Sequence, residues 1–138
     1  MIRYKRLPED IKERLACIED YLGQHPQVIF AYLFGGLARE DHSPLSDVDM
    51  ALYVKDPKRF GYLTDYTKIT NLLGTDELDL VILNRAPLSL AGRILLSRKV
   101  LVDKDPFLRH RYESLTLRKF FDFRIKERAI FTRRYGIG

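Results

Sequence analysis

The chain has 138 residues and a formal net charge of +5, and its 46% hydrophobic and 31% charged residues are typical of a folded globular protein, not of a disordered one. This length predicts a single domain over residues 1–138 that folds without disulfides, and the one cysteine, Cys17, has no partner within the chain. No apolar run reaches the roughly 20 residues of a transmembrane helix and no signal peptide opens the chain, so we expect a cytoplasmic protein that does not contact a membrane.

The hydrophobic pattern predicts alternating helices and strands. A helix is expected over residues 8–23, where Ile11, Leu15, Ile18 and Leu22 recur at helical spacing and Gly23 suits the C-terminal cap. Further helices are expected over residues 62–73, 87–97 and 106–135, and strands over residues 28–34, 48–54, 78–83 and 99–102. In the helix over 62–73, the predicted apolar face consists of Leu63, Tyr66, Ile69 and Leu73. This alternation indicates an α/β or α+β fold.

The first strand ends in Gly35-Gly36, followed by a short helical turn expected over residues 37–40. Glycines let the backbone approach a phosphate closely, and the start of a helical turn directs free N–H groups toward it. In most proteins a Gly-Gly pair is only a turn. The pair therefore gains meaning only from the residues that follow it.

Two carboxylates open the second strand. Alternate side chains of a strand share a face, so Asp47 and Asp49 are expected to point the same way, while Val48 and Met50 face the core. Like charges at this spacing repel, and a divalent cation between them relieves the repulsion. Mg²⁺ suits this role because it binds a few carboxylate oxygens together with substrate phosphates.

The third strand contains a lone acid, Asp79, on the face opposite its apolar residues. If this strand lies beside the second one, Asp79 joins Asp47 and Asp49. Three such carboxylates could hold two metal ions in the arrangement that in-line displacement at phosphorus requires. Asp79 would also be placed to accept the proton of an attacking hydroxyl.

A strand, Gly-Gly, ten residues, Asp-x-Asp and a later lone acid together resemble the signature of the DNA polymerase β-type nucleotidyltransferase superfamily, which is Gly-Ser, about ten residues and Asp-x-Asp. More narrowly, the chain resembles the minimal nucleotidyltransferase (MNT) antitoxins, which are partners of HEPN-domain RNase toxins in prokaryotes. The residues on the motif positions are Gly35, Gly36, Arg39, Ser46, Asp47, Asp49 and Asp79. The resemblance implies a mixed sheet of three to five strands, flanked by helices, with a long C-terminal helix.

The resemblance also implies an activity and its residues. The chain would transfer AMP from ATP to a tyrosine of a HEPN-type toxin with two Mg²⁺ ions as cofactors, and so neutralise the toxin. The implied catalytic and metal-binding residues are Asp47, Asp49 and Asp79, and the implied nucleotide-binding residues are Gly35, Gly36, Arg39 and Ser46. The chain departs from the family pattern at Gly36, which replaces a serine whose hydroxyl helps hold the phosphates, and at Glu40, where a glycine is common.

The basic charge is concentrated in residues 107–135, which contain nine Lys or Arg and three acidic residues with aromatic residues between them. This segment is either a packed helix with a solvated basic side or a surface for a protein partner or RNA. A HEPN-domain toxin is the preferred partner, with RNA second. Two other functions stay open: an MNT-fold module that neutralises its partner by contact alone, and nucleotidyl transfer to RNA or a small molecule.

Overall fold

The computed structural model describes residues 10–39 and 47–135. It contains one four-stranded sheet in the order β3-β2-β1-β4. The strands are β1 (Val28–Phe34), β2 (Val48–Val54), β3 (Leu78–Ile82) and β4 (Lys99–Asp103). Strand β1 pairs antiparallel with β2 and β4, whereas β2 and β3 run parallel, which confirms the expected mixed sheet.

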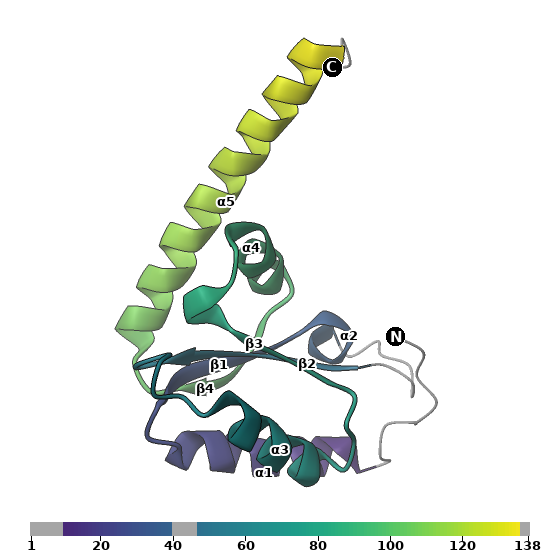
Figure 1. Ribbon diagram of the computed structural model, residues 1–138, viewed down its shortest axis with the longest axis vertical. Helices are drawn as coiled ribbons and strands as arrows, with labels where there is room; N and C mark the ends of the chain where they lie inside the picture. The colour runs from purple at the N-terminus through teal and green to yellow at the C-terminus, as the bar shows by residue number, and fades with distance from the viewer. Residues whose placement is uncertain (1–9, 40–46, 136–138) are drawn as a thin grey trace.

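Helices cover both faces of this sheet (Figure 1). The described helices are α1 (Ile11–Gln24), α2 (Gly35–Arg39), α3 (Tyr62–Leu73), the 3₁₀ helix η1 (Leu83–Arg85), α4 (Leu88–Leu96) and α5 (Pro106–Tyr135). Helices α1 and α3 lie on one face, and α4 and the first part of α5 lie on the other (Figure 1). None of the helices in the described ranges is long and apolar enough to cross a membrane.

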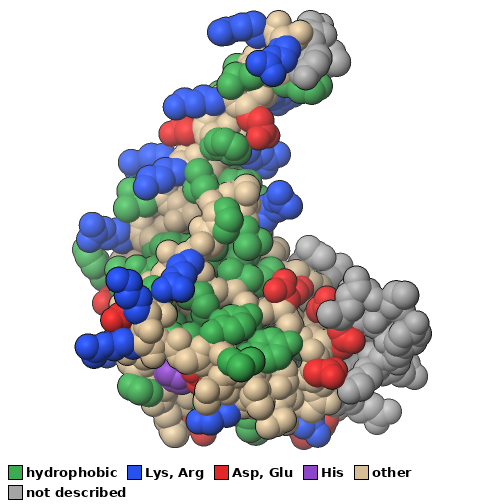
Figure 2. All heavy atoms as spheres, in the orientation of Figure 1, with side chains coloured by type: hydrophobic (Ala, Val, Ile, Leu, Met, Phe, Trp, Pro, Cys, Tyr) green, Lys and Arg blue, Asp and Glu red, His purple; other side chains and the backbone are tan. Residues whose placement is uncertain are grey.

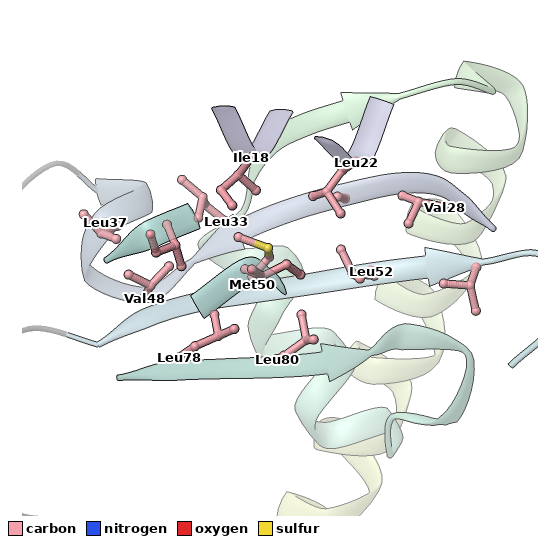
Figure 3. Close-up of a cluster of buried hydrophobic side chains, with 14 of the residues drawn as sticks. Ile18, Leu22, Val28, Leu33, Leu37, Val48, Met50, Leu52, Leu78 and Leu80 are labelled. Carbon is pink, nitrogen blue, oxygen red and sulfur yellow. The ribbon is translucent and has the colours of Figure 1, made fainter. Parts of the chain in front are cut away.

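The larger core lies between the sheet and the α1–α3 layer (Figure 3). Alternate residues of β2, among them Met50 and Leu52, point into it and meet Ile18 and Leu22 of α1. All four side chains are fully buried or nearly so. Burying an aliphatic side chain of this size contributes about 1.5–3 kcal/mol. The alternation predicted for β2 is therefore confirmed, and it fixes which of its residues face the opposite side.

Helix α3 buries Ile69 and Leu73 of the predicted face and packs Tyr66 against the core, but the prediction is wrong at its first turn. Leu63 is 77% exposed, whereas Asp65 is buried. The Asp65 carboxylate accepts a hydrogen bond from the Tyr21 hydroxyl and pairs with His25 Nε2 at 2.9 Å. These partners offset the cost of removing a carboxylate from water, so Asp65, Ile69 and Leu73 form the buried face.

Helix α1 also ends later than predicted. Gly23 lies inside the helix, which continues to Gln24, and the His25 N–H bonds to the Leu22 carbonyl. Pro26 follows at once and disfavours helical backbone at His25, so the proline and not the glycine sets the end. By contrast, Gly74 caps α3 in the left-handed conformation, as its position predicts.

Buried polar contacts hold the first part of α5 to the sheet. Glu113 Oε2 accepts hydrogen bonds from the Tyr32 hydroxyl at 2.7 Å and from Arg98 Nε at 2.8 Å, and Arg109 Nη1 adds a third at 3.0 Å. Burial raises the pKa of Glu113, but these hydrogen bonds and positive charges outweigh it, so the pKa lies below its usual range. The network joins β1, the segment after α4 and α5 into one rigid unit.

The second half of α5 leaves the body of the molecule (Figure 1). The last buried contact is Phe120, whose ring packs so closely on α4 that a Cβ on Gly92 would lie 2.2 Å from it. Beyond this point every side chain from 121 to 131 is exposed. The exposed set includes Phe121, Phe123, Ile125, Ile130 and Phe131. This half of α5 thus mixes exposed large apolar side chains with basic ones, which makes it a candidate binding surface.

Candidate functional site

The candidate site begins where β1 turns into α2. Gly35 has φ of 69°, in the left-handed region, and a Cβ added to it would lie 2.3 Å from Asp49 Oδ2. Glycine is therefore required here twice, by backbone conformation and by the close approach of a carboxylate. The helical turn predicted over residues 37–40 is α2, which begins two residues earlier and includes both glycines.

The parallel pairing of β2 and β3 brings two of the predicted carboxylates together. Asp49 and Asp79 are directly paired in the register, on strands that lie about 4.8 Å apart in a sheet. Both lie on the face opposite the larger core, because Met50 and Leu80 next to them point into that core. The predicted juxtaposition of these two acids is confirmed. Asp47 precedes β2 by one residue and is partly buried, as is Asp49, whereas Asp79 is exposed.

An all-oxygen pair of this kind suits Mg²⁺, which is commonly bound by one or two carboxylates together with substrate phosphates. Within residues 10–39 and 47–135, no group of three or more His, Cys, Asp or Glu side chains is close enough to hold a metal ion. The pair of Asp49 and Asp79 fits a cation whose remaining ligands are oxygens of a bound nucleotide. The site for two ions built from Asp47, Asp49 and Asp79 stays a prediction.

Two of the predicted nucleotide-binding residues are not placed in detail. Arg39 is the last residue of α2, and Ser46 lies outside the described residues. Their contacts with nucleotide stay predictions.

Two tyrosines hold the edge of the sheet beside Asp79. The hydroxyls of Tyr62 and Tyr66 donate to the carbonyl oxygens of Leu80 and Leu78, at 2.7 and 3.2 Å. Burial raises the pKa of Tyr62, and the neighbouring Tyr66 and Asp79 raise it further. The phenols satisfy carbonyl groups of an edge strand and so fix the strand that carries Asp79.

An open pocket of about 550 Å³ lies between this acidic edge and α4. This volume is in the range of small-molecule sites. Its lining residues are Phe34, Gly35, Asp49, Leu90, Arg93, Ile94, Leu96 and Ser97. Gly35 and Asp49, predicted from the sequence, thus share a pocket with residues of a helix that begins about 40 positions later.

Two residues of this pocket, Arg93 and Ser97, were not predicted from the sequence. The Ser97 hydroxyl, just after α4, accepts a hydrogen bond from the Gly35 N–H at 3.3 Å. Arg93 is the one charged residue of α4, and it lies exposed at the pocket. A lone cation in an apolar helix was the only available signal, because the pocket that Arg93 and Ser97 share with Asp49 depends on how α4 packs on the sheet.

The family model described as "Polymerase beta, Nucleotidyltransferase" matches residues 17–107, which is more than half of the chain and includes both aspartate strands. The chain belongs to the polymerase beta nucleotidyltransferase family. No curated protein matches it.

Several solved structures similar to this nucleotidyltransferase chain are described as toxin–antitoxin structures. A chain in the crystal structure of a toxin–antitoxin with AMP-PNP has 20% identity and a TM-score of 0.62, over 88% of this chain and 93% of that one. A chain of the toxin–antitoxin MntA-HepT has 21% identity and a TM-score of 0.60, over 88% and 93%. A chain from the tri-AMPylated Shewanella oneidensis HEPN toxin in complex with MNT antitoxin has 19% identity and a TM-score of 0.60, over 88% and 92%. At these identities the similarity establishes the shared fold.

The substitution Gly36→Ser is expected to be tolerated and to raise nucleotide affinity up to a few-fold. Among the described glycines only Gly35 and Gly74 have positive φ, so Gly36 has no such conformational requirement. The new hydroxyl adds a donor beside the pocket. Thermal unfolding and MgATP titration of the variant check this. A large drop in both stability and affinity would show that Gly36 is needed for backbone shape.

Proposed function

We propose that this chain is an antitoxin that transfers AMP from ATP to a tyrosine of a HEPN-type RNase toxin and thereby neutralises it. The observation that carries the proposal is that Asp49, which lines a pocket together with Gly35, is paired in the sheet register with Asp79. Family membership supports nucleotidyl transfer. The similar structures support the choice of partner, because one contains AMP-PNP and another an AMPylated HEPN toxin.

In the proposed reaction, the oxygen of the acceptor hydroxyl attacks the α phosphorus of ATP. A new O–P bond forms, the bond from the α phosphorus to the oxygen bridging to the β phosphate breaks, and pyrophosphate leaves with that electron pair. The carboxylate of Asp79 accepts the hydroxyl proton. Because Asp79 is exposed, the proton can then pass to water.

The other residues bind and orient the nucleotide. Asp49 and Asp79, with Asp47 as the third predicted ligand, would hold Mg²⁺ together with phosphate oxygens of the nucleotide, and the ion when bound would neutralise the charge of the triphosphate and of the departing pyrophosphate. Gly35 and Gly36 let the backbone approach the phosphates closely. The apolar walls from α4, among them Leu90 and Ile94, would keep water from one side of the nucleotide.

The position of the transferred label tests the proposal. The chain is mixed with a HEPN-domain protein as the proposed partner and with MgATP radiolabelled at either the α or the γ phosphate. The α label is expected on the partner and the γ label in pyrophosphate. A γ label on the partner would indicate a kinase. Loss of the partner's RNase activity without any label would indicate neutralisation by contact alone.

The exposed half of α5 is expected to bind the protein partner in preference to RNA. Replacing Arg124, Arg128 and Arg133 with Ala should weaken partner binding about tenfold, because Arg and aromatic side chains dominate protein interfaces. Figure 2 shows these two kinds of side chain side by side along the helix, with Lys and Arg in blue and hydrophobic residues in green. The measurement is partner and RNA affinity across salt concentrations.

The matched control for this triple variant is Arg111→Ala, at an exposed α5 residue in the packed half of the helix. Binding through phosphates alone would fall by about 10³-fold or more between 50 and 200 mM salt for six or more contacts. The affinity of a protein interface with apolar anchors should fall far less over the same range of salt concentration. Unchanged partner binding together with lost RNA binding would identify α5 as an RNA-binding helix.

A further inference from the structure

A second pocket adjoins the one that contains Asp49. It has a volume of about 320 Å³ and lies between α4 and α5. Its lining residues are Ser89, Arg93, Leu96, Phe120, Phe123, Arg124 and Glu127. Arg93 and Leu96 line both pockets, so the two meet across the exposed side of α4. We call this second pocket the α4–α5 groove.

The α4–α5 groove combines apolar and cationic surface. Leu96 is 55% exposed and Phe123 is 45% exposed, although both are large apolar side chains. Arg93 and Arg124 supply positive charge, and neither has an ion-pair partner among the described residues. Arg124 lies 5.5 Å over the ring of Phe120, which holds its guanidinium at the groove. A partner of this groove therefore needs acidic groups together with apolar side chains.

A protein segment fits the groove better than an RNA strand does. Glu127 lines the groove, and Asp49 lies in the pocket beyond it, so a chain of phosphates would meet a carboxylate at each end. Leu96 gives an aliphatic contact, which suits a side chain and not the face of a base. The exposed Phe123 and the two arginines are of the residue types that anchor protein interfaces.

We propose that the α4–α5 groove seats an acidic, extended segment of the partner protein and leads its tyrosine across Arg93 and Leu96 to Asp49. This inference rests on the proposed function. It makes α4 the bridge between the surface that binds the partner and the pocket that binds the nucleotide. The acceptor tyrosine then lies on the segment that contacts Phe123, and not on a distant part of the partner.

Cross-linking tests where the acceptor segment lies. The photoreactive residue p-benzoylphenylalanine is introduced in place of Phe123, and in a control in place of Ile130, which is exposed on the same helix but lines neither the groove nor the Asp49 pocket. Each variant is irradiated in complex with the HEPN-domain protein, and cross-linked peptides are identified by mass spectrometry. The Phe123 position should cross-link to the peptide that becomes AMPylated, and the Ile130 position to a different peptide. Cross-links from position 123 to other peptides only would overturn the inference.

Charge reversal gives an independent readout. Arg124→Glu should lower AMP transfer at subsaturating partner by about tenfold or more, because it places a like charge against the acidic segment. The affinity for MgATP should stay the same, because Arg124 does not line the Asp49 pocket. Arg111→Glu makes the same charge change at an exposed α5 residue outside the groove and should leave transfer unchanged. Equal transfer by both variants would contradict the inference.

The two failures are distinguishable. If the unaltered chain places no AMP on the partner, the proposed function fails, whatever position 123 cross-links to. If it does place AMP there, but position 123 cross-links elsewhere, the proposed function stands and the path through the groove is wrong.

Discussion

Replacing Asp49 with Asn is expected to lower AMP transfer by about 10³-fold or more while leaving the fold intact. The substitution removes a negative oxygen at the point where Asp49, Asp79 and the Gly35 backbone meet. Stabilisation of charge by a bound metal is worth several kcal/mol, and each 1.36 kcal/mol corresponds to about a tenfold change in rate. Because Asn has nearly the same shape as Asp, the free energy of unfolding should change by no more than about 1 kcal/mol.

Initial rates of label transfer and thermal unfolding of the Asp49→Asn variant check this expectation. Asp20→Asn is the matched control, because Asp20 is exposed on α1, across the sheet from the site. The same account predicts that ATP affinity depends on Mg²⁺ or Mn²⁺ and drops when a chelator is added. Equal ATP affinity with and without chelator would show that no metal ion is bound with the nucleotide. Transfer by Asp49→Asn close to that of the unaltered chain would show that Asp49 is not a metal ligand.

Replacing Gly35 with Ala is expected to cost both stability and nearly all activity. The left-handed conformation at φ of 69° carries a penalty of about 1 kcal/mol or more for any residue with a Cβ. The new methyl group would also lie 2.3 Å from Asp49 Oδ2 and must displace that carboxylate or the turn itself. We therefore expect a fall of about 1–3 kcal/mol in the free energy of unfolding, within the usual range for single substitutions.

Urea unfolding and label transfer measure the two effects of Gly35→Ala. The control is Gly23→Ala, because Gly23 lies inside α1 and an added Cβ there meets nothing within 4 Å. That change should stabilise the chain by about 0.5–1 kcal/mol, as expected when alanine replaces glycine in a helix, without altering transfer. If Gly35→Ala were as stable and active as the unaltered chain, the close approach of Gly35 to Asp49 would not be needed for folding or for AMP transfer.

Local patterns were enough to predict much of the fold. Strands β1 and β2 match their predicted bounds because buried strands appear as short apolar runs between turn residues. Helices α3 and α5 match theirs as well, and the parallel pairing that joins Asp49 with Asp79 confirms the condition that the sequence analysis set. The bounds of these elements depend on residues close by in the sequence, and the pairing of the two aspartates depends only on β2 and β3 being neighbours in the sheet.

Features that depend on distant contacts were missed. Asp65 is buried because Tyr21 and His25, about 40 residues earlier, provide its hydrogen bonds. Arg93 and Ser97 belong to the site only because α4 packs beside the end of β1. The point at which α5 leaves the body, after Phe120, was not predicted either. Apolar residues continue along the whole helix, so the sequence does not show where its packing on α4 stops.

The most direct test of the central claim is the intact mass of the proposed HEPN-domain partner after incubation with this chain and MgATP. The account predicts a mass increase of one or more AMP groups, located on tyrosine, which is absent with Asp49→Asn and absent with chelator. A partner that keeps its original mass with the unaltered chain, while its RNase activity is lost, would contradict the account and show that the chain neutralises by contact alone.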